Sequence, residues 1–103
     1  MNKLEWALQN NQELYKTFIA NIVDELTAYQ QEIVVCNQEG DFSKLKVMAH
    51  NIRSTASLIG DYNLKIVAAY WEGVFDRQLA TQVDDFCLII QESIEKLGKI
   101  LNE

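Results

Sequence analysis

The chain contains no proline and only four glycines among its 103 residues, so very little in it interrupts an α-helix. Proline breaks helices because it lacks a backbone N–H and its ring clashes with the preceding turn, and glycine weakens them through its backbone freedom. The candidate interruptions are Gly40, Gly60, Gly73 and Gly98. We therefore predict an all-α protein.

The spacing of apolar residues divides the chain into helices. Between about residues 11 and 38, apolar side chains recur every three or four positions, which predicts one long amphipathic helix. The run Ile33 to Cys36 suits a strand by propensity, but it continues the helical phase before it. The predicted elements are a short helix at about 2–9 and four longer helices at about 11–38, 42–59, 61–77 and 81–102.

Connections of only a few residues force neighbouring helices to run antiparallel. The expected architecture is an antiparallel up-down-up-down four-helix bundle with a short additional N-terminal helix. We expect one domain over residues 1–103, since this length suits a single helical core.

Composition excludes several classes of function. The formal net charge of −6 argues against nucleic acid, which requires a basic surface. No stretch is long and apolar enough to cross a bilayer, and Glu5 interrupts any secretory signal, so we expect a cytoplasmic protein without membrane insertion. Cys36 and Cys87 lack metal-ligand or redox spacing and are predicted to be reduced, partly buried thiols.

His50 is the single histidine, and helical phase places it away from the predicted core. A helix turns about 100° per residue. The residues within roughly 60° of His50 on this basis are Lys46, Val47, Arg53, Ser54 and Ser57. The apolar residues on the opposite side are Leu45, Met48, Ile52 and Ile59. The imidazole is therefore expected to face solvent.

Two cations flank His50 on a protein that is otherwise acidic. Lys46 lies one turn before it and Arg53 about one turn after it, which makes a local surface that attracts anions. Ser54 and Ser57 can add hydroxyl donors. The alternative is that His50 is an ordinary surface residue and that the cations only solvate this helix face.

Other catalytic patterns are missing from the sequence. One histidine cannot build a metal site of the usual nitrogen and sulfur type, and there is no Gly-rich phosphate loop, GxSxG elbow or HExxH motif. Without an ATP-binding element, a phosphoryl group on His50 has to come from another protein.

The segment Ala49 to Gly60, AHNIRSTASLIG, resembles the signature of the histidine phosphotransfer (HPt) domain family, A-H-x-L-K-G-[SA]-A-x-x-[LIV]-G. The resemblance extends over nearly the whole chain. Gly40-Asp41-Phe42 is similar to the Gly-Asp-aromatic turn before the family's histidine helix. The pattern of the helix after it is matched by Leu64, Ala68 and Glu72.

The resemblance implies that His50 is the phospho-accepting residue of a two-component phosphorelay. It would take a phosphoryl group from an aspartyl phosphate on a response-regulator receiver domain and pass it to another receiver. The implied partners are such receivers and a hybrid sensor histidine kinase. No cofactor is expected, because in this family Mg²⁺ is bound by the receiver, and the chain is expected to be a phosphoryl carrier rather than an enzyme.

Supporting roles are expected for the residues around His50. The phosphoryl group would be neutralised or held by Lys46, Arg53, Ser54 and Ser57. Val47 and Leu58 lie at roughly 60° and 80° from His50 around the helix, so they are candidates for docking a receiver. The alternative is that both pack against a neighbouring helix.

The sequence departs from the family pattern at two positions. Arg53 stands where lysine is usual, which keeps the charge but replaces a compact ammonium by a planar fork. Ser54 stands where glycine is usual, one turn from His50. These departures leave open an alternative function, a degenerate HPt-like bundle that binds a receiver or kinase as an adaptor or inhibitor without being phosphorylated.

Overall fold

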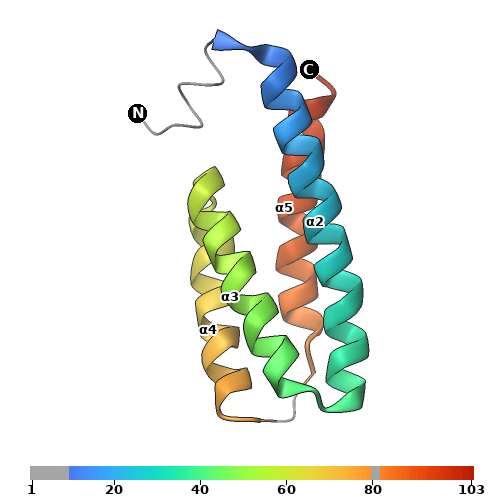
Figure 1. The fold of residues 1–103 in the computed structure, drawn as a ribbon, viewed down its shortest axis with the longest axis vertical. Coiled ribbons are helices and arrows are strands. Elements are labelled where there is room, and N and C mark those ends of the chain that lie inside the picture. Colours follow the sequence, from blue (N-terminus) through green and yellow to red (C-terminus); the bar gives the residue numbers. More distant parts are fainter. Residues whose placement is uncertain (1–9, 80–81) are drawn as a thin grey trace.

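A computed structural model describes residues 10–79 and 82–103 of the chain. These residues form four helices and no strand (Figure 1): α2 (Gln12–Glu39), α3 (Phe42–Ile59), α4 (Tyr62–Asp76) and α5 (Asp84–Leu101). The prediction of an all-α protein is confirmed. The short helix predicted at about 2–9 lies outside the described residues.

The last helix begins at Asp84, later than the expected start at about residue 81. Val83 is the residue that precedes it, and its side chain is buried. Asp84 and Asp85 then occupy the first turn, where acidic side chains are favourable beside the helix N-terminus. Two of the four glycines do not interrupt helices, because α4 continues through Gly73 and α5 through Gly98.

The other two glycines form a repeated Gly-Asp turn. Gly40 and Gly60 adopt left-handed backbone conformations, with φ of 69° and 74°, that end α2 and α3. The aspartate that follows each glycine caps the next helix: Asp41 accepts from the backbone N–H of Lys44 at 3.2 Å, and Asp61 from that of Leu64 at 3.1 Å. These two turns set the ends of the helix that carries His50.

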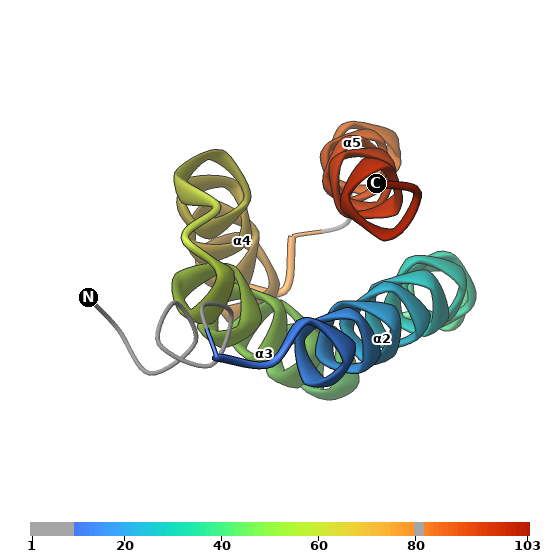
Figure 2. The same cartoon turned by 90° about the horizontal axis from the view of Figure 1, so that it is seen from above.

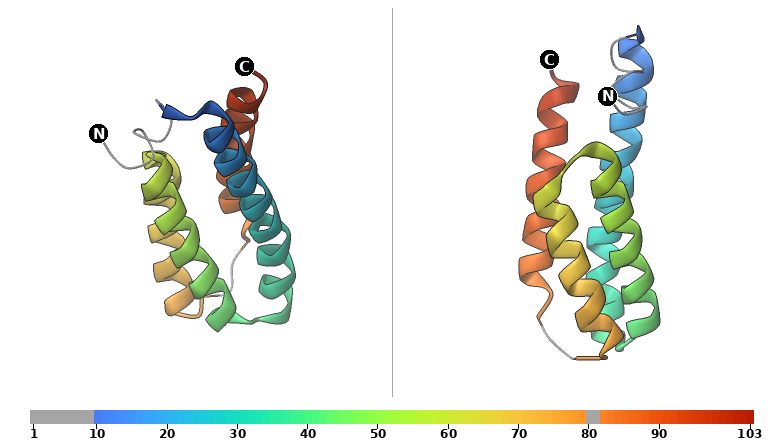
Figure 3. Two further views of the ribbon diagram at one scale, coloured as in Figure 1. Left: turned by 45° about the horizontal axis from the view of Figure 1, so that its top comes forward. Right: turned by 90° about the vertical axis from the view of Figure 1, so that its left-hand side faces the viewer.

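The four helices lie side by side, and the α2–α3 and α3–α4 turns lie at opposite ends of α3 (Figures 1 and 3). Seen from above, α3 lies between α2 and α4, and α5 lies beside α2 (Figure 2). The closest packing is between α3 and α4. Three fully buried alanines, Ala49 and Ala56 of α3 and Ala68 of α4, suit this close approach because small side chains let helix axes come together.

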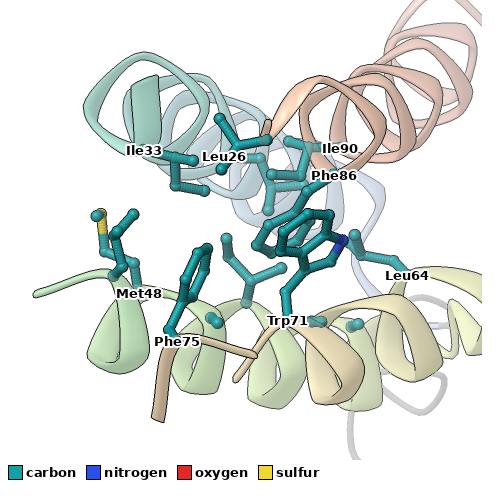
Figure 4. Close-up of a cluster of buried hydrophobic side chains, with 14 of the residues drawn as sticks. Leu26, Ile33, Met48, Leu64, Trp71, Phe75, Phe86 and Ile90 are labelled. Atoms are coloured by element: carbon teal, nitrogen blue, oxygen red, sulfur yellow. The ribbon is translucent and has the colours of Figure 1, made fainter. Parts of the chain in front are cut away.

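The core is built from side chains of all four helices (Figure 4). Its aromatic centre stacks Trp71 on Phe86, with ring centroids 5.7 Å apart and planes 3° from parallel, while Phe75 packs beside both rings. Such contacts hold α4 against α5 and so help to set the position of the α4 face beside His50. Ser93 is a buried polar residue, and its hydroxyl donates to Asp61 at 2.6 Å.

Candidate functional site

His50 lies on the solvent side of α3, as helical phase predicts. Its side chain is 52% exposed, whereas Leu45, Met48 and Ile52 on the opposite side of the helix are buried. The fourth apolar residue expected on that side, Ile59, is only partly buried and packs against the core. The imidazole is therefore accessible to a second protein.

One nitrogen of the His50 ring contacts two charged side chains. Nδ1 lies 3.1 Å from Oε1 of Glu72 on α4 and 3.0 Å from a guanidinium nitrogen of Arg53 on α3. No hydrogen bond from the described residues reaches Nε2. The described contacts thus hold the ring through Nδ1.

Glu72 is the least exposed member of this group. Its side chain is 18% exposed, and Oε2 is buried without a hydrogen-bond partner. The second guanidinium nitrogen of Arg53 lies 3.3 Å from that oxygen, close enough for an ion pair although the hydrogen-bond geometry is not met. His50, Arg53 and Glu72 consequently form a closed three-member cluster between α3 and α4, which we call the histidine cluster.

Lys46 does not belong to the histidine cluster. Its ammonium group is bound to Asp76 of α4 at 2.7 Å, and both side chains are largely exposed. The hydrogen bond and charge of Asp76 raise the pKa of Lys46, and Lys46 lowers the pKa of Asp76 in return. The lysine expected to neutralise a phosphoryl group is therefore already paired.

The two serines are exposed but differently placed. The hydroxyl of Ser54 donates to the backbone carbonyl of His50 at 3.2 Å, so in this rotamer it points back along α3. It has to rotate before it can donate to a phosphoryl oxygen. Ser57 is exposed one turn further on.

Val47 and Leu58 are both exposed, at 58% and 48%. They do not pack into the core, so the alternative that they are buried against a neighbouring helix does not hold. Val47 also lines a shallow depression on the surface of α2 and α3 together with Glu32, Lys44 and Met48. Val47 and Leu58 thus place two exposed apolar side chains beside the face of α3 that carries His50.

Sequence reasoning missed the contact that most defines this site. The sequence marks Glu72 only as part of a helix pattern, and no periodicity within α3 identifies a partner 22 residues away on another helix. The sequence likewise does not identify Asp76 as a partner of Lys46. This pairing occupies the ammonium group that was expected to bind phosphate. Acidic residues on the α4 face beside α3 were the available clue.

Comparison with protein-family models, with curated proteins and with solved structures found no match to this chain. Within the described residues, no group of three or more His, Cys, Asp or Glu side chains is placed to hold a metal ion. None of the described helices has the length and apolar character needed to span a membrane. Cys36 and Cys87 are free thiols, and burial raises the pKa of each.

Proposed function

We propose that this chain is an HPt domain that carries a phosphoryl group on Nε2 of His50 between the aspartates of receiver domains. The observation that supports this most directly is the histidine cluster: an exposed imidazole is held at Nδ1 and left open at Nε2. The motif from Ala49 to Gly60 supports the same assignment.

The chemistry follows from the tautomer that Glu72 favours. When Nδ1 carries the proton and donates it to the Glu72 carboxylate, Nε2 holds a lone pair and is a nucleophile. Its lone pair attacks phosphorus, the N–P bond forms, and the P–O bond to the donor aspartate breaks with its electron pair on the leaving carboxylate. The imidazolium charge that develops is stabilised by Glu72.

The four helices would form an up-down-up-down antiparallel bundle of the HPt type, which presents the exposed His50 to a receiver. The receiver would supply its own aspartates and Mg²⁺, and a hybrid sensor histidine kinase would supply phosphate at the start of the relay. The protein would act in the cytoplasm as a carrier rather than an autonomous enzyme.

The test is transfer from a phosphorylated receiver domain to the purified protein. We expect label to move to this chain within a single turnover and to return to a second receiver. Incubation with ATP alone should leave the protein unlabelled. If no phosphorylated receiver from a broad panel transfers label, or if pure protein takes label directly from ATP, the carrier assignment is wrong.

Val47 offers a test of receiver docking. Exposed apolar side chains beside a reactive group are common in binding surfaces. We expect Val47→Asp to weaken receiver binding by about tenfold, as loss of one well-placed apolar contact plus burial of a charge would do. The melting temperature of the Val47→Asp variant should change little, because Val47 is exposed in the unbound protein.

Val35→Asp is the matched control for that variant. Val35 is an exposed valine on α2, on the side of that helix opposite the buried Leu26. Calorimetric titration with one receiver should therefore give wild-type affinity for Val35→Asp and reduced affinity for Val47→Asp. Equal affinities for the two variants would show that Val47 does not contact the receiver.

Ser54 tests how the phosphoryl group approaches. Side chains four residues apart on a helix are neighbours, about 5–6 Å between Cβ atoms. Ser54→Leu adds bulk beside His50 on the exposed face and should slow single-turnover transfer by at least about tenfold. Ser54→Gly should retain transfer with slightly lower helix stability. Wild-type transfer by Ser54→Leu would mean that the donor approaches from another side.

The second candidate function is an adaptor that binds a partner without being phosphorylated. It is favoured by an apolar stripe on the outer face of α4, formed by the largely exposed Tyr62, Ile66 and Tyr70. The stripe borders a hollow lined by residues of α4 and α5, among them Trp71 and Ile89. Partner binding that is unchanged in His50→Gln, together with no label transfer to wild type, would favour the adaptor.

A further inference from the structure

The two contacts to Nδ1 of His50 require opposite protonation states. Oε1 of Glu72 can only accept a hydrogen bond when the carboxylate is ionised, so its contact requires a proton on Nδ1. The guanidinium of Arg53 can only donate, so its contact requires a lone pair on Nδ1. One ring nitrogen cannot satisfy both side chains at once.

The contacts therefore correspond to two neutral tautomers of His50 with different reactivity. If Arg53 donates to Nδ1, the ring proton is on Nε2 and that nitrogen has no lone pair in the ring plane. If Glu72 accepts from Nδ1, the lone pair is on Nε2 and faces solvent. Both hydrogen bonds involve an ionised partner, which makes each of them stronger than a bond between neutral groups, so the two contacts compete for Nδ1.

The surrounding charges single out Arg53 as the group that can leave. Glu72 is mostly buried on α4, whereas the Arg53 side chain is 38% exposed. Lys46, on the same face of α3, is bound to Asp76 at 2.7 Å. The guanidinium of Arg53 is paired within the histidine cluster but partly exposed, so an anion arriving from solvent at His50 can contact it.

We propose that Arg53 is a positioning residue that controls which nitrogen of His50 is nucleophilic, and that an incoming phosphoryl group releases this control. This inference rests on the proposed function. In the resting protein Arg53 competes with Glu72 for Nδ1 and keeps part of the population in the unreactive tautomer. When phosphoryl oxygens bind the guanidinium, Nε2 gives its proton to water, and Nδ1 takes a proton from water and donates it in a hydrogen bond to Glu72. Nε2 then holds the lone pair and is the nucleophile.

The planar shape of arginine explains how one side chain can do this. Its two terminal nitrogens reach Nδ1 of His50 and Oε2 of Glu72 separately, at 3.0 Å and 3.3 Å. A lysine ammonium is a single point of charge and cannot span both groups in this way. The arginine at this position therefore adds a coupling between phosphate binding and the tautomer of His50.

The tautomers can be measured directly, because the chain has a single histidine. The experiment uses the protein of residues 1–103 labelled with ¹⁵N in the imidazole, with any purification tag removed, and compares wild type and variants at one mildly alkaline pH. The ¹⁵N shifts and long-range proton couplings of the ring then give the ratio of the Nδ1–H to the Nε2–H tautomer. Arg53→Met removes the donor but keeps a long side chain.

We expect the Nδ1–H to Nε2–H ratio to rise about tenfold in Arg53→Met, which corresponds to losing one hydrogen bond from a charged group. Arg77→Met is the matched control, since Arg77 is the other arginine of the chain and is exposed at the end of α4. It should show the wild-type ratio. An unchanged ratio in Arg53→Met would overturn the proposal.

Inorganic phosphate provides the second arm of the experiment. Added against sodium chloride of equal ionic strength, phosphate should raise the Nδ1–H fraction in wild type and in Arg77→Met but not in Arg53→Met. An equal response in all three proteins would overturn the proposal. This arm needs no receiver. If phosphate raises the Nδ1–H fraction as expected but no receiver transfers label, the proposed phosphorelay function is wrong, while the control of the His50 tautomer by Arg53 still holds.

Discussion

Replacing His50 by glutamine should abolish phosphoryl acceptance completely while the helices and the melting temperature stay nearly unchanged. Glutamine cannot supply the imidazole nucleophile, but its amide can still donate to the Glu72 carboxylate that the ring now contacts. Because the replaced side chain is about half exposed, the change in unfolding free energy should stay within about 0.5 kcal/mol.

Phosphate chemistry and thermal melting together check this prediction. The label on wild type should be stable to base and labile to acid, because a phosphoramidate hydrolyses once its nitrogen is protonated. His50→Gln should carry no such label after incubation with the same phosphorylated receiver. Residual label on the variant would place the acceptor elsewhere, and loss of its helical signal would show that His50 has a structural role.

Glu72→Gln should give the second large effect, a decrease of about 10- to 100-fold in the single-turnover rate of transfer to His50. The substitution keeps the shape of the side chain but removes the charge that, in the proposed mechanism, favours a proton on Nδ1 and stabilises the imidazolium. Hydrogen bonds to charged groups contribute about 1.5–3 kcal/mol, which corresponds to that range of rates.

The stability of Glu72→Gln should be close to that of wild type. Oε2 of Glu72 is already buried without a hydrogen-bond partner, so removing the charge lowers a desolvation cost while it weakens the ion pair with Arg53. Glu92→Gln is the control, since Glu92 is exposed on α5 and outside the histidine cluster. If both variants transfer phosphate at the wild-type rate, Glu72 does not assist the nucleophile.

Structural features that depend only on residues close to one another in the chain were predictable from the sequence. Helical phase placed His50 on the opposite side of α3 from Leu45 and Ile52, because a regular helix converts spacing into direction. The Gly-Asp pairs at the ends of α2 and α3 marked the turns, since a left-handed glycine and a capping aspartate act within a few residues. The exposure of Val47 followed from the same phase, although packing against a neighbour was an open alternative.

The partners of the site, in contrast, were decided only by how α3 and α4 pack. Glu72 reaches Nδ1 across 22 residues, and Asp76 takes Lys46 across 30, because the close contact between these two helices brings their polar edges together. The sequence by itself determined that the chain is helical and that His50 faces solvent, since both are local consequences of periodicity. Which ring nitrogen is held, and which acidic residue pairs with each cation beside it, depended on the tertiary structure, because contacts between helices require a relative placement that no single helix contains.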